Sequence, residues 1–406
     1  MVLTSPVAVA QTAALTLDDA IARAVETDPG LAAASSGIDA ALGGVRQARV
    51  RPNPTAGADI ENVTRRGGEP RDTTLSISQE IELGGRRSAR INLADRELRG
   101  AELDRALRGL DLIRDVQTAY FDALVAQELV SIEQERLATA ESLNGAVARR
   151  VQAARDPLMA GARAEAGLAE ARIAVTQAEA GAATALARLR SLIGGGDFSL
   201  NTTALSLPPD GTHAHPVGAE SNPDLARLAA EQQRAAADTR LQRSLAWQNP
   251  ALSFGFRRSE PAFGAGRDSS LTVGVSIPFG IFDRNQGNIA RARANERTAE
   301  FNLEAGRRAL QRETDALQRS IAADQAAIAS IDRTVLPQAA RALTLAQDGY
   351  NRGGFTYLDV IEAQRALSSA RQVRLESLKS FHENEAALDR LTARFAEALP
   401  GTEIHK

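Results

Sequence analysis

Residues 74–83 read TLSISQEIEL, and residues 271–279 read LTVGVSIPF. Within each stretch, large apolar residues alternate with small, hydroxyl-bearing or acidic residues, which is the pattern of a β-strand with one apolar and one polar face. Two further segments alternate in the same way, and in each pair the segments are separated by a loop containing glycine and proline. The sequence therefore predicts two β-hairpins, with strands at about 55–62, 73–83, 251–257 and 271–279.

Two environments fit these amphipathic strands. A strand that crosses a bilayer needs about 9–11 tilted residues with one apolar face, whereas a half-buried antiparallel sheet in a water-soluble protein has the same alternation. The membrane is favoured because no other segment is left to cover the apolar faces. Four strands cannot close a barrel, and open sheet edges are not tolerated in lipid. A membrane-spanning chain is therefore predicted to form a trimer, in which three copies of four strands make a twelve-stranded tube.

The rest of the chain is predicted to form long helices. No proline interrupts residues 71–156 or 279–336, and Ala, Leu, Arg, Glu and Gln dominate both stretches. One helix over residues 86–155 would be about 105 Å long, which predicts a coiled coil or a long bundle. Apolar residues at seven- and four-residue steps form a coiled-coil seam in the second half: Leu303, Leu310, Leu317, Ile321, Ile328 and Val335.

The two halves of the chain share one order of elements. Asp28-Pro29 recurs as Asn222-Pro223, and Asn53-Pro54 recurs as Asn249-Pro250, at nearly the same offset. The strand pairs and the proline-free stretches recur in step with these motifs. Self-similarity of this kind predicts two structural repeats within one chain.

The repeats set the predicted domain organisation. The N-terminal tail contains Ala8-Val9-Ala10, a small-residue pattern typical of an export-signal cleavage site, so the tail is interpreted as the end of such a signal. A proline-rich linker joins the repeats. The predicted boundaries are 1–14 for the signal remnant, 15–206 for the first repeat, 207–216 for the linker, 217–399 for the second repeat and 400–406 for the C-terminal tail.

Composition excludes several classes of protein. Of the 406 residues, 43% are hydrophobic, which excludes a disordered chain. The 48 basic and 51 acidic residues give a net charge of −3, whereas a nucleic-acid-binding protein would need a basic excess. The absence of cysteine removes disulfides, thiolate metal sites and cysteine nucleophiles. No apolar run approaches the ~20 residues of a transmembrane helix.

The sequence contains no pattern typical of an enzyme, because neither a Ser-His-Asp arrangement nor a phosphate-binding loop is apparent. His213 and His215 are the only clustered pair of metal-ligand side chains. They lie in the linker without an acidic or thiol partner nearby, so a solvated loop is favoured over a metal site. No cofactor is predicted.

Several segments resemble the TolC family of bacterial outer-membrane efflux channels. The resemblance covers about residues 15–395 and rests on the order and double occurrence of its motifs. The turn that leads from the second strand into the next helix looks most like the CzcC-like heavy-metal branch. The motifs are LTLDDAI at 15–21 followed by Asp28-Pro29, RPNP at 51–54, SQEIELGGRR at 78–87, and Y-x-x-G-x-x-x-x-L-D-V-x-E-A at 350–363.

The resemblance implies a fold class that is mainly α with a small β part. In a homotrimer of this kind, a twelve-stranded β-barrel in the outer membrane continues into a periplasmic α-helical barrel. The resemblance also implies a periplasmic adaptor protein and a proton-driven RND pump of the inner membrane as partners, with outer-membrane lipid around the barrel. Heavy-metal cations would pass through passively, without covalent chemistry.

Two alternatives to a metal-efflux channel stay open. A multidrug-efflux or type I secretion channel would have the same fold. A periplasmic coiled-coil adaptor or scaffold protein comes from another class, and its strands would remain in water.

The resemblance places three candidate site residues at the periplasmic entrance. Asp359 and Glu362 match acidic positions that line the closed entrance, and threefold symmetry would gather six carboxylates around its axis. Such a ring favours cations and resists tight closure. Tyr350 would hold the entrance shut by hydrogen bonding across neighbouring hairpins. The alternative is two surface acids and a buried aromatic side chain.

The turns between the long helices are the candidate contacts with the adaptor, because turns at hairpin ends are exposed. The alternative is that they only connect helices. The first turn lacks the glycines of the second, so the two turns are not expected to make equivalent contacts. Many relatives also carry an acylated cysteine, which this chain lacks. The candidate residues are Arg155, Asp156, Pro157, Arg352, Gly353, Gly354 and Phe355.

Overall fold

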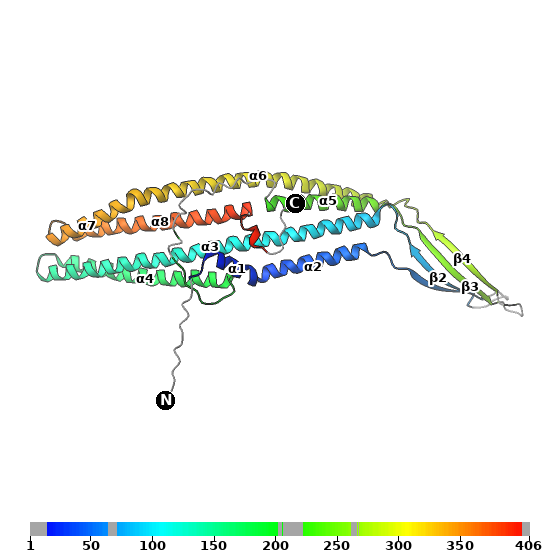
Figure 1. Ribbon diagram of the computed structural model, residues 1–406, viewed down its shortest axis with the longest axis horizontal. Coiled ribbons are helices and arrows are strands. Elements are labelled where there is room, and N and C mark those ends of the chain that lie inside the picture. The colour runs from blue at the N-terminus through cyan, green and yellow to red at the C-terminus, as the bar shows by residue number, and fades with distance from the viewer. Residues whose placement is uncertain are drawn as a thin grey trace, which may run out of the picture. The chain divides into compact units, whose positions relative to one another are not determined.

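The computed structural model of the chain is mainly helical, with one four-stranded sheet (Figure 1). It describes residues 14–63, 71–201, 205, 222–260, 266 and 268–399. Residues 1–13 of the predicted signal remnant 1–14, the linker 207–216 and the tail 400–406 lie outside the described residues. The helices are α1 (Leu17–Thr27), α2 (Pro29–Arg49), α3 (Arg86–Gln152), α4 (Leu158–Leu192), α5 (Pro223–Ser244), α6 (Gln286–Ser330), α7 (Leu336–Arg352) and α8 (Tyr357–Thr392).

Helix starts follow local chemistry. Thr16 caps α1, because its hydroxyl accepts from the backbone N–H of Asp19 at 3.2 Å while the Asp19 carboxylate reaches back to Thr16. Proline opens α2 and α5 and precedes α4, at positions where a missing N–H costs no helical hydrogen bond. Within the described part of the chain, no helix combines the length and apolarity needed to cross a bilayer.

The helix that leads into the second long hairpin is interrupted. A π-helical turn, η2 (Ile331–Val335), separates α6 from α7, and Pro337 follows in the first turn of α7. A proline ring clashes with the carbonyl four residues before it, and a wider turn relieves that clash. Arg374 of α8 holds this turn through Asp332 at 2.5 Å. The seam residue Ile328 therefore lies just before this irregularity and Val335 is its last residue, which their seven-residue spacing does not predict.

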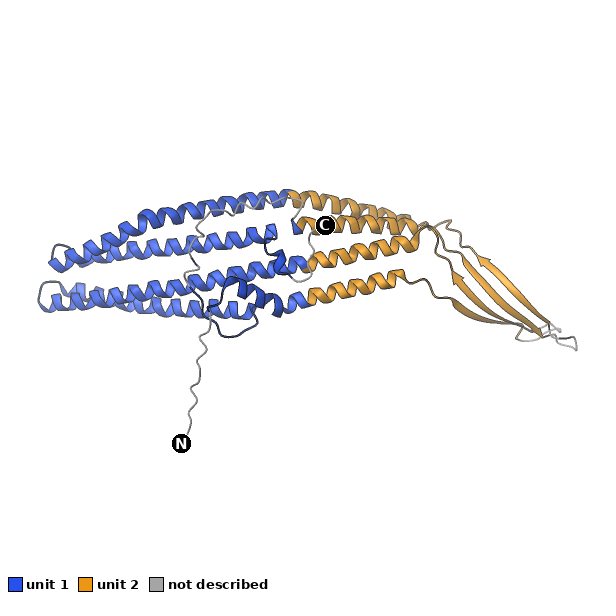
Figure 2. Ribbon diagram, in the orientation of Figure 1, with its two compact units in different colours: residues 1–32, 106–223, 308–406 blue, residues 33–105, 224–307 orange. Residues whose placement is uncertain are grey.

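The chain divides into two compact units, each built from segments of both predicted repeats (Figure 2). The first comprises residues 1–32, 106–223 and 308–406, and the second comprises residues 33–105 and 224–307. The compact units therefore differ from the repeats, whose boundaries stay a prediction.

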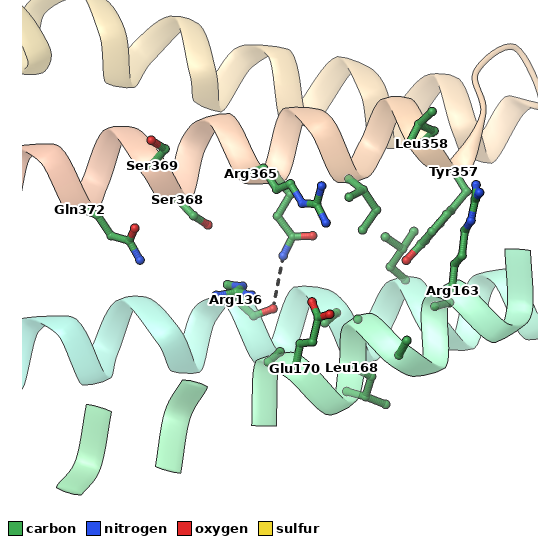
Figure 3. A pocket seen from close by; sticks show the side chains of 18 residues that line it. Arg136, Arg163, Leu168, Glu170, Tyr357, Leu358, Arg365, Ser368, Ser369 and Gln372 are labelled. Atoms are coloured by element: carbon green, nitrogen blue, oxygen red, sulfur yellow. Dashed lines mark hydrogen bonds between the residues drawn. The ribbon is translucent and has the colours of Figure 1, made fainter. Parts of the chain in front are cut away.

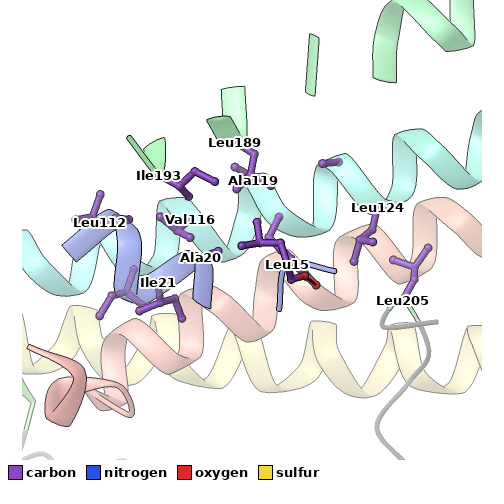
Figure 4. Packing of buried hydrophobic residues seen from close by; sticks show 14 of the residues in the cluster. Leu15, Ala20, Ile21, Leu112, Val116, Ala119, Leu124, Leu189, Ile193 and Leu205 are labelled. Carbon is purple, nitrogen blue, oxygen red and sulfur yellow. Dashed lines mark hydrogen bonds between the residues drawn. The ribbon is translucent and has the colours of Figure 1, made fainter. Parts of the chain in front are cut away.

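The core of the first unit surrounds α1 (Figure 4). Buried apolar side chains from α1, α3, α4 and α8 contact one another there, and the Tyr120 hydroxyl donates to the carbonyl of Leu15 at 3.0 Å. This packing joins α3, α4 and α8 around α1, together with Ile328 of α6. The most enclosed members include Ala20, Leu110, Leu112, Val116, Leu124, Leu189, Ile328, Leu378 and Phe381.

The second unit carries an antiparallel sheet of order β1-β2-β3-β4: β1 (Thr55–Glu61), β2 (Arg71–Glu80), β3 (Ala251–Glu260) and β4 (Asp268–Ser276). Each predicted hairpin forms, and β2 pairs with β3 to join them. The register sets Ile77 opposite Phe254, which is opposite Val273. Alternate residues therefore line up across strands and give the sheet one continuous apolar face.

The apolar face is exposed in the chain. More than half of the Leu75, Phe254 and Val273 side chains is accessible. The opposite face is polar, and Arg257 there pairs with Asp72 and, at 3.1 Å, with Glu61. A sheet with one polar face and one uncovered apolar face needs two different environments.

Two strands end earlier than the alternation predicts. Beyond Glu80, the Ile81 N–H still donates to the Pro250 carbonyl at 2.9 Å in the same register, but Pro250 has no N–H to return the bond, and the ladder ends there. Strand β4 ends at Ser276, two residues before Pro278, which lacks the N–H that a ladder requires. Side-chain alternation continues past both ends, which explains the longer predicted ranges of 73–83 and 271–279.

Candidate functional site

The turn between α3 and α4 is closed by a bidentate ion pair. The Arg150 guanidinium donates from Nε and Nη2 to the two carboxylate oxygens of Asp156, both at 3.0 Å. Such fork-to-fork pairs fix geometry as well as charge. Arg150 lies in the last turn of α3, where a cation is favoured by the helix dipole.

Tyr350 connects this turn to the second hairpin. Its hydroxyl donates to Asp156 Oδ2 at 2.7 Å, and Arg150 Nη1 donates to the Tyr350 carbonyl at 3.0 Å. The Arg150 guanidinium also lies 4.6 Å from the centroid of the Tyr350 ring. We call Arg150, Asp156 and Tyr350 the turn latch, because together they join the ends of the α3–α4 and α7–α8 hairpins.

The pKa values of the three turn-latch residues are all shifted by their contacts with one another. Hydrogen bonds from Arg150 and Tyr350 hold the pKa of Asp156 below its ordinary value, while the bond to Asp156 raises the pKa of Arg150. Burial, then the bond to Asp156, raises the pKa of Tyr350. All three shifts favour an ionised Asp156 between two protonated donors.

The second turn is set by close packing and a capping box. The Phe355 ring lies on Gly349, where an added Cβ would come within 2.0 Å of it. Thr356 caps α8: Asp359 accepts from the Thr356 backbone N–H and hydroxyl, both at 2.7 Å. These bonds lower the pKa of Asp359, chiefly through the Thr356 hydroxyl. Asp359 therefore has a structural task at the start of α8.

Glu362 differs from Asp359 in its surroundings. Both side chains are exposed, one turn apart on α8, but Glu362 has no hydrogen bond or ion pair with any residue that the structure describes. Of the two predicted entrance acids, Glu362 is thus the one whose carboxylate has no partner among the described residues.

Replacement of Thr356 by alanine is expected to destabilise the start of α8 by about 1 kcal/mol, because the capping hydroxyl is lost. Thermal unfolding of the purified protein in detergent would measure the change. Thr356→Ser retains the hydroxyl and serves as the control. Equal melting temperatures for the alanine and serine variants would contradict the capping role.

Behind the turn latch, the two hairpins enclose a cavity of about 560 Å³ between α3, α4 and α8. Figure 3 shows Tyr357 reaching from α8 toward α4, beside Arg163. The Gln364 side chain crosses the gap and donates to the Arg136 carbonyl at 3.4 Å. A cavity means fewer side-chain contacts between the hairpins, so polar contacts such as the turn latch carry more of their association.

Both turns expose apolar side chains beside the predicted contacts. Leu158 is 82% exposed, and Met159, Phe355 and Leu358 are at least half exposed. Arg155, Pro157, Arg352, Gly353 and Gly354 are exposed as well, whereas Asp156 is turned into the latch. Sequence reasoning missed Arg150, Leu158 and Met159. The proximity of Arg150 to a proline-containing turn was the available signal.

The predicted histidine pair adds nothing to this site. His213 and His215 lie outside the described residues. In the part of the chain that is described, no group of three or more His, Asp or Glu side chains is gathered to hold a metal ion.

The fold and the two hairpin turns can be compared with known proteins. The profile of the family described as "Outer membrane efflux protein" matches residues 20–195 and again residues 219–394. The chain belongs to this family. It is an outer-membrane efflux channel that extends into the periplasm, and the family consists of channel proteins rather than enzymes.

Individual relatives agree with the family assignment. The chain is 32% identical to the cobalt-zinc-cadmium resistance protein CzcC of Cupriavidus metallidurans, over 94% of this chain and 90% of that protein. It is 27% identical to the pyoverdine export outer membrane protein OpmQ of Pseudomonas aeruginosa, over 84% and 74% of the two chains. A crystal structure of CusC has the same fold, with a TM-score of 0.77, 18% identity and coverage of 96% and 93%.

Proposed function

We propose that three copies of this efflux channel assemble into a twelve-stranded barrel continuous with a periplasmic helical tube. The observation that supports this most is the sheet: its apolar face is exposed, and β1 and β4 are edges in the order β1-β2-β3-β4. Edges facing lipid leave backbone groups without partners. Pairing β4 of one copy with β1 of the next removes both edges. The two separate family matches support the proposed internal repeat.

Heavy-metal cations are the proposed cargo, exported passively from periplasm to exterior. CzcC, whose name denotes cobalt, zinc and cadmium resistance, aligns along nearly the whole chain. The similarity to OpmQ keeps export of an organic compound as the second candidate. The family assignment places the chain among channels, which disfavours a periplasmic adaptor or scaffold.

A deletion strain complemented with this chain tests the cargo. If the cargo is metal, complementation is expected to restore growth on cobalt, zinc or cadmium and to leave tolerance of organic antibiotics unchanged. The converse result would replace metal by organic cargo. A chain that lacks strand β4 serves as the inactive control, because it cannot close the tube.

The proposed partner proteins are inferred from the exposed turns at the ends of the two hairpins. We propose that the α3–α4 and α7–α8 turns dock a periplasmic adaptor protein, which links the channel to a proton-driven RND pump in the inner membrane. The exposed Leu158, Phe355 and Leu358 support this, because apolar side chains at a helix end favour a protein contact. The turn latch is proposed to keep the entrance closed until docking.

Glu362 is the proposed source of cation preference at the entrance. Glu362→Gln is expected to lower the ratio of cation to anion permeability in planar bilayers several-fold, since one uncommitted carboxylate per copy is removed. Glu313→Gln, an exposed acid on α6, is the matched control. An unchanged ratio in Glu362→Gln would remove Glu362 from the entrance.

A further inference from the structure

Large apolar side chains are exposed where the sheet of the second unit meets its helices. The segment between β4 and α6 exposes Phe279 (82%), Ile281 and Phe282 (91%), and the segment between α5 and β3 exposes Trp247 (66%). In water such exposure is unfavourable, so these residues need another environment.

Ordered contacts present these side chains. The Trp247 ring lies against Gly84, where an added Cβ would come within 2.8 Å of it, and Arg86 donates to the Trp247 carbonyl at 2.9 Å. The Asn285 side chain donates to the Gln242 carbonyl at 2.8 Å, which ties the β4–α6 segment to α5. The exposed aromatics are therefore held in place by the junction itself.

Three arginines share this junction. Arg51 follows α2, Arg243 lies in the last turn of α5, and Arg284 precedes α6. All three are exposed, and among the residues that the structure describes none of them has an ion-pair partner. The Arg284 guanidinium donates through Nε to the Gly280 carbonyl at 3.1 Å, and the Arg284 backbone N–H donates to Gln286 Oε1 at 2.8 Å.

The acids of the same junction are largely committed. Glu82 is held by Arg90, and Glu80 accepts from Asn249 at 2.6 Å. Asp283 accepts from the Asn285 N–H at 2.8 Å. Asp283 keeps its charge in that bond, so the three arginines without an ion-pair partner outnumber it, and the unpaired charge around the exposed aromatics is net positive.

The junction also continues the apolar face of the sheet. Phe279 and Ile281 follow Val273, Val275 and Ile277 at the same two-residue step. The apolar surface thus ends in a row that combines aromatic rings with guanidinium groups. Rings and arginines together suit the boundary between acyl chains and phosphates.

We propose that this junction binds anionic phospholipid headgroups, with the phosphates on Arg51, Arg243 and Arg284 and the glycerol and acyl region on Trp247, Phe279 and Phe282. The inference rests on the proposed placement of the sheet in the membrane, which puts the junction at the periplasmic leaflet. Anionic lipid is preferred over zwitterionic lipid because the free charges of the junction are positive.

Trp247 is the only tryptophan of the chain, so its fluorescence reports on this junction alone. The test is quenching of Trp247 in the full-length protein by brominated phosphatidylglycerol and by brominated phosphatidylcholine, titrated separately. The wild type is expected to bind phosphatidylglycerol about tenfold more tightly. The triple variant R51Q/R243Q/R284Q is expected to lose that preference and retain quenching by both lipids.

Arg312→Gln, an exposed arginine of α6 outside the junction, is the matched control and is expected to behave like the wild type. Equal affinity for both lipids in the wild type would overturn the proposal, as would an unchanged preference in the triple variant. A loss of oligomer in the triple variant would also overturn it, by showing that the arginines contact a second copy.

Conductance of the same preparations in planar bilayers separates this inference from the proposed function. A wild type that conducts but shows no lipid preference refutes only the lipid site. A wild type that shows the preference but never conducts refutes the channel assembly and leaves the lipid site standing.

Discussion

Asp156→Ala is expected to raise the open probability of the resting channel in planar bilayers by tenfold to a hundredfold. The substitution removes the acceptor of two arginine bonds, which close the α3–α4 turn, and of the tyrosine bond, which joins that turn to the second hairpin. Hydrogen bonds to charged groups contribute about 1.5–3 kcal/mol each when partly buried. If the loss of only one such bond per channel shifted the equilibrium, the ratio of open to closed channels would change by roughly tenfold to a hundredfold.

Arg155→Ala is the matched control, because Arg155 is the exposed neighbour in the same turn. Tyr350→Phe removes only the hydroxyl and should give a smaller increase than Asp156→Ala. Circular dichroism and oligomer content should match the wild type in all three variants. If Asp156→Ala and Arg155→Ala conduct alike, the turn latch does not hold the entrance closed.

The latch also predicts a pH dependence. With the turn latch formed, its hydrogen bonds hold the pKa of Asp156 below the ordinary value of 3.8. A lowered carboxyl pKa stabilises the closed state fully above the ordinary value, and that contribution is lost only as the pH falls through the lowered pKa. Open probability in the wild type should therefore stay constant between about pH 5 and pH 8. Any rise in open probability below about pH 5 should be absent in the Asp156→Ala variant.

Local signals account for much of the fold. The capping box at Thr16 and the proline at residue 29 are typical of helix starts, and α1 (Leu17–Thr27) and α2 (Pro29–Arg49) begin there. Period-two alternation predicts all four strands. Their ends differ by a few residues because alternation describes side chains, whereas a strand ends with its backbone ladder. The β2–β3 pairing was not predicted, since no turn connects those strands.

The site was less predictable, for a physical reason. Tyr350 was a candidate from its motif, but its partner Arg150 lies 200 residues away in sequence. Spacing within one helix carries no information about contacts between hairpins. Asp359 and Glu362 show the same limit: one turn apart on α8, they have different surroundings because only Asp359 reaches the Thr356 cap.

Val273→Arg is expected to prevent assembly of the channel in the outer membrane. Val273 lies in the middle of the apolar face, opposite Phe254. An arginine on the lipid face of a barrel costs about 2–4 kcal/mol near the bilayer midplane. Three copies would triple that cost, which is comparable to the whole stability of an ordinary domain. Assembled channel in purified outer membranes should fall at least tenfold.

Thr272→Arg is the matched control for Val273→Arg, because it places an arginine on the opposite face of the same strand. Thr272 is the preceding residue of β4, and its side chain lies on the polar face that the proposed barrel encloses. An arginine there would stay in water, so assembly should be close to that of the wild type. Both variants add the same charge to the same strand. Equal assembly of the two would show that the apolar face does not contact lipid, and a soluble sheet would then explain the alternation at residues 271–279.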